Sequence, residues 1–323
     1  MNDIRLNFEK RFLAFFSALF FASIISLIDW EAVQGTVFED RQNFYFVFNS
    51  KPDFDIPFTL ETVFFHLFNE QLWNKGVRTL VSVYKFSLDE IFFAVSFLLL
   101  FAFSYFVAIR TKIYMVLLLV NPIVIDLAFS QLRMSMALVL LMLAASLKSS
   151  FFIIILFLMA FFIHTATLLF AVLAYGIIKV VYYSSKNDYQ NFRSYFSLVA
   201  FGLIVAITVG PLRNVILEFF GDRRANYDIA ASGWAYASFW MFLLAVTMFQ
   251  KKEFFRSVEN AVAVSMLSTF VFCTAFGVYG IRFIAASFPM LIVSMYRLGY
   301  MERPFVILSF MAFTIFQWIF WIR

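Results

Sequence analysis

The sequence is poor in cysteine, histidine and charge. Its 323 residues include one cysteine and two histidines, and only 14% are Asp, Glu, Lys or Arg, whereas a soluble domain carries about 25%. The single cysteine, Cys273, lies in an apolar run and excludes an internal disulfide. So few His and Cys residues also exclude a His/Cys metal cluster. We therefore expect neither a metal nor a cofactor.

Nucleotide-binding loops are also missing. The sequence has neither a P-loop nor a GxGxxG fingerprint. The net charge of +5 could suggest nucleic acid, but its distribution follows membrane topology instead, so we expect no nucleic-acid partner. A nucleotide-using enzyme would need such phosphate-binding machinery on the cytoplasmic side.

Apolar residues are abundant. They make up 63% of the chain, with 49 phenylalanines and a mean hydropathy of +0.87. No soluble fold of this length could bury them all, which predicts an all-α integral membrane protein surrounded by lipids. We expect one polytopic domain over 1–323 with about eleven transmembrane helices (range about 9–12), since a span needs about 20 apolar residues. The expected spans are 12–28, 91–109, 113–129, 131–147, 150–164, 166–183, 194–211, 234–250, 258–276, 283–297 and 304–322.

The basic residues orient this layout. With the N-terminus in the cytoplasm, the cytoplasmic segments hold 14 of the 25 Lys and Arg residues and 6 of the 20 acids, a net charge of +8. The outer side then holds 11 bases and 14 acids, a net charge of −3. This asymmetry matches the positive-inside rule. No small-residue cleavage site follows 12–28, so we interpret it as the first membrane helix and not as a signal peptide.

One long outer loop is expected over 29–90. Within it, 59–73 has the pattern of an amphipathic helix lying on the membrane surface. The loop also holds Glu39-Asp40-Arg41 and Glu61. Either glutamate could deprotonate a sugar hydroxyl, with Glu61 favoured because its helix would cover a cavity in the bundle. Ordinary solvated loop charges are the alternative.

The fourth expected span opens with Ser130-Gln131-Leu132-Arg133. If Ser130 caps that helix, its free N–H groups and the Arg133 guanidinium form a site for a phosphate. The alternative is an arginine that snorkels to lipid headgroups. Asp126, seven residues earlier, could be the counter-charge that holds Arg133, or could act directly.

Other polar residues of the outer side could join this site. His164 ends the fifth span and could act as a general base or bind phosphate, or it could simply be a hydrogen-bonded membrane histidine. Arginines also stand in later outer segments, namely Arg223, Arg224 and Arg282. Guanidinium groups bind phosphates bidentately, so the pattern suggests an outward-facing pocket for a pyrophosphate.

These motifs resemble the Wzy/EpsG-type exopolysaccharide and O-antigen polymerases over about residues 38–285. The matching features are Glu39-Asp40-Arg41 with Tyr45, Glu61 before an aromatic helix, Gln131-Leu132-Arg133, Phe162-Ile163-His164-Thr165-Ala166, and the late outer arginines. The sequence departs from the family at Thr62, where a proline is usual, and at Met134, where glutamine is usual.

The resemblance implies a metal-independent glycosyltransferase of the bacterial inner membrane. It would join oligosaccharide repeat units carried on undecaprenyl pyrophosphate, at the outer face, beside a chain-length regulator and a flippase. Arg133 would be the main pyrophosphate ligand, assisted by Arg282, by Arg223 or Arg224, by Arg41 and by Gln131. Glu61 or His164 would be the base, with Asp126 and Asp40 as structural support.

Three other functions stay open. A flippase for the same lipid-linked sugars would place polar residues deep in many helices and usually shows inverted repeats; no repeat is visible here. A ligase that moves finished glycan to lipid A would use similar arginines and a histidine. A membrane acyltransferase with His164 as base would need polar residues at a cytoplasmic donor site, and the sequence shows none.

Overall fold

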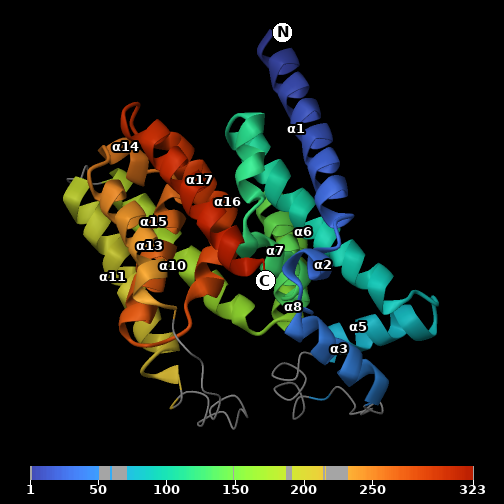
Figure 1. Ribbon diagram of the computed structural model, residues 1–323. Helices are drawn as coiled ribbons and strands as arrows, with labels where there is room; N and C mark the ends of the chain where they lie inside the picture. Colours follow the sequence, from blue (N-terminus) through green and yellow to red (C-terminus); the bar gives the residue numbers. More distant parts are fainter. Residues whose placement is uncertain are drawn as a thin grey trace. The chain divides into compact units, whose positions relative to one another are not determined.

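The computed structural model describes residues 2–50, 59, 71–147, 149–186, 191–213, 215 and 232–322 (Figure 1). These residues fold into helices and connecting turns, and none of them lies in a strand. The expectation of an all-α fold is therefore confirmed for the described part of the chain. The chain divides into two compact units, Met1–Phe170 with Gln317–Arg323, and Ala171–Phe316. The expectation of one membrane domain over 1–323 stays a prediction.

The helices of the two units follow one another in chain order. The first unit contains α1 (Asn2–Ser26), α2 (Trp30–Gln34), α3 (Glu39–Ser50), α5 (Gln71–Ser82), α6 (Leu88–Arg110), the 3₁₀-helix η1 (Ile113–Leu119), α7 (Pro122–Phe129), α8 (Leu132–Ser146) and α9 (Ser150–Ile163). Helix α10 (Ala166–Lys186) runs from the first unit into the second. The second unit continues with α11 (Asn191–Val209), α13 (Trp234–Met248), α14 (Lys252–Phe255), α15 (Val258–Ala275), α16 (Ile281–Arg297) and α17 (Glu302–Trp321).

Four described helices are long and apolar enough to cross a membrane: α6, residues 166–183 of α10, α15 and α17. A bent pair, α7 with α8, would make a fifth span. These segments coincide within a few residues with spans expected from hydropathy. Shorter apolar helices occupy Ser150–Ile163, Arg193–Val209 and Trp234–Met248. The structure thus supports a helical membrane protein, and the count of eleven spans stays a prediction.

The expected single helix over 113–129, kinked at Asn121-Pro122, is instead two separate helices. The segment forms η1, then a break, then the eight-residue α7. Proline has no backbone N–H and fits the first turn of a helix, so Pro122 begins a new helix instead of kinking an old one. The Asn121 side chain caps it by accepting from the Ile123 N–H at 2.9 Å. Helix α8 then leaves α7 at an angle of 98°.

The proposed cap of α8 is also corrected. Ser130 ends α7, since its N–H donates to the Asp126 carbonyl at 2.8 Å. Gln131 is the N-cap of α8 and makes no side-chain cap hydrogen bond. Two serines fix the corner between the helices instead. The Ser135 hydroxyl donates to the Leu127 carbonyl, and the Ser96 hydroxyl of α6 donates to the Ala128 carbonyl, both at 2.6 Å.

The region expected to be a long loop, 29–90, contains the helices α2, α3 and α5. Helix α5 buries Trp73 and Val77, which are four residues apart and lie on one face. Both pack in an apolar cluster with Phe44 of α3. The expected surface helix over 59–73 lies almost entirely outside the described residues. The described residues of 29–90 thus form mainly helices, and α3 and α5 pack apolar side chains inside the first unit.

The end of α17 belongs to the first unit and fastens the break at 120–121. The Asn121 amide donates to Gln317 Oε1 at 2.6 Å, and Trp318 Nε1 donates to the Val120 carbonyl at 3.3 Å. Trp318 also stacks on Trp30, with ring centroids 5.4 Å apart. The Val120 carbonyl and the Asn121 side chain therefore have partners at the break, as an apolar surrounding requires.

The second unit packs its helices through small residues. An added Cβ at Gly202 of α11 would lie 2.4 Å from Ser268 Oγ and 2.7 Å from the Ser265 carbonyl oxygen of α15. Both serines donate hydrogen bonds to α11, Ser265 to the Leu198 carbonyl and Ser268 to the Val199 carbonyl. Close approach at small residues with interhelical hydrogen bonds is typical of membrane helices.

Candidate functional site

An ion pair joins α3 to the start of α6. Arg41 Nη2 donates to Asp89 Oδ1 at 2.6 Å. Tyr45, one helical turn after Arg41, donates its hydroxyl to the same carboxylate oxygen. Burial and this hydrogen bond raise the pKa of the Tyr45 phenol. The three side chains form one network that holds Arg41 in a fixed position.

The sequence around Asp89 explains its placement. Ser87 and Glu90 form a capping box, in which the Ser87 hydroxyl accepts from the Glu90 N–H and Glu90 accepts from the Ser87 N–H. Asp89 therefore stands in the first turn of α6, where the helix dipole favours a carboxylate. Phe92, one turn further, lies with its ring centroid 5.8 Å from the Arg41 guanidinium.

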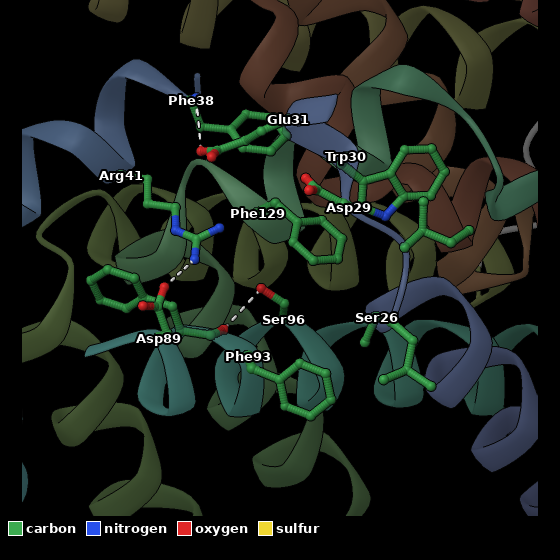
Figure 2. Close-up of a pocket in the computed structure, with 13 residues that line it drawn as sticks. Ser26, Asp29, Trp30, Glu31, Phe38, Arg41, Asp89, Phe93, Ser96 and Phe129 are labelled. Carbon is green, nitrogen blue, oxygen red and sulfur yellow. Dashed lines mark hydrogen bonds and ion pairs between the residues drawn. The ribbon is translucent and has the colours of Figure 1, made fainter. Parts of the chain in front are cut away.

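A pocket of 380 Å³ lies beside this network. Figure 2 shows residues of α2 along one edge and residues of α6 along the other. The pocket is lined by Ser26, Leu27, Ile28, Asp29, Trp30, Glu31, Phe38, Arg41, Asp89, Phe92, Phe93, Ser96 and Phe129. It thus lies where the polar turns after α1 and before α6 meet the apolar bundle.

Two buried polar atoms at this pocket are unsatisfied. Among the described residues, neither Ser26 Oγ nor Arg41 Nε has a hydrogen-bond partner. Ser26 is only 6% exposed. Buried polar atoms in proteins nearly always have partners, so two unsatisfied polar atoms in residues of one pocket lining are unusual.

The charges of the pocket lining do not balance. Three carboxylates, from Asp29, Glu31 and Asp89, face one guanidinium, from Arg41, which gives a formal charge of −2. Two carboxylates already order the backbone: Asp29 accepts from the Ala32 N–H and Glu31 from the Phe38 N–H. No three His, Cys, Asp or Glu side chains within the described ranges are grouped to hold a metal ion.

Arg133 lies next to Phe44 of α3. It is half-buried in the first turn of α8, and its guanidinium carbon is 5.1 Å from the centroid of the Phe44 ring. This is a cation–π distance. Arg133 does not line the pocket. Phe44 follows Arg41 by three residues, so helix α3 links the pocket to Arg133.

Gln131 and Asp126 support the corner that carries Arg133. Gln131 Nε2 donates to Asp126 Oδ2 at 2.9 Å. Gln131 Oε1 is buried and has no hydrogen-bond partner within the described part of the chain. Asp126 as direct counter-charge of Arg133 stays a prediction, and so does Gln131 as a substrate ligand.

His164 is the half-buried C-cap of α9. Its neighbour Ile163 belongs to the same apolar cluster as Leu132 and Phe44. Leu132 precedes Arg133 in the sequence. Arg133 and His164 therefore flank one cluster, at the start of α8 and the end of α9.

The remaining predicted site residues are not brought together here. Glu61, Arg223 and Arg224 lie outside the described residues. Arg282 is exposed in the second unit, with its guanidinium carbon 5.9 Å from the centroid of the Tyr279 ring. Asp40 lies in α3 and does not line the pocket.

Sequence reasoning missed Asp89, Glu31, Asp29 and the two serines of the pocket. Asp89 was visible only as an acid in front of an apolar run, within the Ser87-x-x-Glu90 capping pattern. Nothing in the sequence paired it with Arg41, 48 residues earlier. Asp29 and Glu31 directly follow the first expected span, and nothing in the sequence indicates that they line a pocket.

Comparisons with protein families, with curated proteins and with solved structures find no match to this chain.

Proposed function

We propose that this protein is a polysaccharide polymerase that joins repeat units carried on undecaprenyl pyrophosphate, at the outer face of a bacterial inner membrane. The observation that carries the proposal is the arrangement around α3. One end of this helix contributes Arg41 to a polar pocket, and Phe44 packs against the half-buried Arg133. Glycosyl transfer from a lipid pyrophosphate needs a fixed cation for the leaving group, and the half-buried Arg133 supports this role.

The reaction can be written with the residue types present. The oxygen of an acceptor hydroxyl bonds to the anomeric carbon of the donor glycan, while the bond from that carbon to the pyrophosphate oxygen breaks. A base takes the hydroxyl proton, and lipid pyrophosphate leaves. Fixed cations stabilise the charge that develops on the leaving group. No nucleotide is needed, since the lipid carrier supplies activation.

Arg133 is the cation that we assign to the pyrophosphate. Its ring partner Phe44 and the hydrogen-bonded corner around Gln131 hold it before substrate arrives, and a preorganised cation stabilises a transition state without further rearrangement. Arg282, Arg223 and Arg224 remain proposed as assisting ligands. Glu61 and His164 remain the proposed bases.

A glycan gel from the native host tests this function. We expect the ladder of a wild-type strain to collapse to a single repeat unit when the gene is deleted, and to return with the wild-type gene but not with Arg133→Ala. Immunoblotting of membranes must show equal protein. An unchanged ladder in a deletion strain without a second polymerase gene would sink the proposal.

A flippase is the second candidate, because the structure contains a broken helix pair. Helices α7 and α8 meet at 98°, and discontinuous helices often line substrate paths in transporters. The same gel separates the two functions. Loss of even the single repeat unit on deletion would favour the flippase, whereas retention of that unit favours the polymerase.

A further inference from the structure

The charge of the pocket argues against a pyrophosphate ligand there. The lining has a formal charge of −2, and its one guanidinium already pairs with Asp89 at 2.6 Å. Glu31 attracts the same guanidinium. A phosphate entering the pocket would meet three carboxylates, although the exposed positions of Asp29 and Asp89 let solvent screen part of the repulsion. The net negative charge of the lining therefore favours a neutral ligand over an anionic one.

The hydrogen-bonding groups of the pocket fit hydroxyl groups. Carboxylates accept hydrogen bonds from hydroxyls, and a guanidinium donates to them. Ser26 Oγ, in a side chain only 6% exposed, has no partner among the described residues, and neither has Arg41 Nε. A ligand hydroxyl can accept a hydrogen bond from Arg41 Nε and can donate one to Ser26 Oγ. The largely buried side chains of Phe38, Phe92 and Phe129 complete the lining with an apolar wall.

The size of the pocket and the placement of its carboxylates further restrict the class of ligand. The volume of 380 Å³ lies at the small end of the roughly 300–1,000 Å³ range of small-molecule sites. The carboxylates are spread around the lining, since the described His, Cys, Asp and Glu residues form no group of three that could hold a metal ion. Separate carboxylates suit several hydroxyls of one ring better than a single cation.

We infer that this pocket binds an uncharged sugar and discriminates against acidic sugars. Binding of the sugar follows from the pocket alone. That the sugar is the acceptor end of a lipid-linked repeat unit rests on the proposed function. Donor and acceptor are then separated by charge: the pyrophosphate goes to Arg133, and the neutral sugar goes to the pocket that contains Arg41.

Matched pairs of methyl glycosides test this inference. The purified full-length protein in lipid nanodiscs is titrated with methyl glucoside and methyl glucuronide, with methyl galactoside and methyl galacturonide, and with methyl N-acetylglucosaminide. Saturation-transfer NMR reports the binding. We expect at least one neutral glycoside to bind and its acidic counterpart to bind about tenfold more weakly or not at all, a difference of about 1.4 kcal/mol.

Two conservative variants connect the binding to this pocket. Ser26→Ala removes an unsatisfied hydroxyl, which leaves folding unharmed, and should weaken neutral-sugar binding about 2- to 10-fold, as expected for one hydrogen bond. Glu31→Gln should reduce the difference in binding affinity between neutral and acidic sugars. Ser104→Ala is the control, because Ser104 is a buried serine of α6 that does not line the pocket and donates to the Leu100 carbonyl of its own helix.

The outcomes are distinct. Equal or tighter binding of the acidic glycosides, absence of binding by all neutral ones, or identical effects of Ser26→Ala and Ser104→Ala would each overturn the inference. The glycan gel judges the polymerase separately. A collapsed ladder without sugar discrimination would leave the polymerase standing and remove this pocket ligand, whereas sugar discrimination with an unchanged ladder would do the reverse.

Discussion

Arg41 of α3 and Asp89 of α6 are joined by an ion pair of 2.6 Å across 48 residues of sequence. The pair determines which way the guanidinium faces, and so shapes the pocket. The Asp89 side chain is 68% exposed and that of Arg41 is 22% exposed. Exposed pairs contribute only about 0–1 kcal/mol to stability. The importance of this pair is therefore positional.

Breaking the pair should cost function more than stability. We expect Asp89→Asn to lower the thermal midpoint of the detergent-solubilised protein by only a few degrees, consistent with a loss below about 1 kcal/mol. Polymer formation should fall much further, because Arg41 loses its fixed position. Tyr45→Phe, which removes one hydrogen bond to the same carboxylate, should give a milder defect. If polymer formation in Asp89→Asn and Tyr45→Phe fell only in proportion to the loss of thermal stability, the positional role would be contradicted.

Replacement of Arg133 tests the buried cation. We expect Arg133→Ala to lower turnover by about 10²- to 10³-fold, corresponding to about 2.7–4 kcal/mol, as for the loss of one oxyanion donor. Arg133→Lys should recover part of the activity, since it keeps the charge but not the planar fork. Arg110→Ala is the matched control, because Arg110 also stands over a ring, 3.8 Å from the centroid of Phe106. Similar losses in Arg110→Ala and Arg133→Ala would show that the effect is not specific.

The packing of α11 on α15 predicts a glycine-dependent stability. We expect Gly202→Ala to destabilise the protein by about 1–3 kcal/mol, because its Cβ would lie 2.4 Å from Ser268 Oγ. Gly76→Ala should be neutral or stabilising by about 0.4–1 kcal/mol, since Gly76 is helical and an added Cβ meets nothing within 4 Å. Thermal unfolding of both variants in the same detergent measures the difference. A Gly202→Ala variant as stable as Gly76→Ala would refute the close contact.

Cysteine labelling tests the expected orientation. Cys273 is buried and the sequence has no other cysteine, so Cys273→Ala provides a background without thiols. In intact cells with a permeable outer membrane, a membrane-impermeant maleimide should label Tyr84→Cys and not Lys112→Cys. Both positions are exposed and flank α6. The opposite pattern would place the pocket on the cytoplasmic side and exclude our assignment.

Hydropathy predicted some elements well and others poorly, for physical reasons. The segments of α6, α15 and α17 are continuous apolar runs, and their helical bounds were predicted within a few residues. The segment 113–129 is equally apolar, but hydropathy does not register the missing N–H of Pro122, which ends one helix and begins another.

The candidate site was predictable only in part. The sequence predicts Arg133 because it opens an apolar span, and Arg41 because it lies in the Glu39-Asp40-Arg41 motif of the outer loop. Their partners were not predictable, because Asp89 and Phe44 meet them through tertiary packing. The net charge of the pocket depends on Asp29 and Glu31. Their sequence positions resemble those of ordinary loop acids, and only the fold of α2 brings them to the pocket.

The most direct test of the central claim is a reconstituted reaction. Purified protein in nanodiscs would be supplied with the host's lipid-linked repeat unit and with chelator present. We expect glycans of two or more repeat units together with released undecaprenyl pyrophosphate, and no such products with Arg133→Ala. A folded wild-type protein that leaves the repeat unit unchanged, while membranes of the same host polymerise it, would contradict the account.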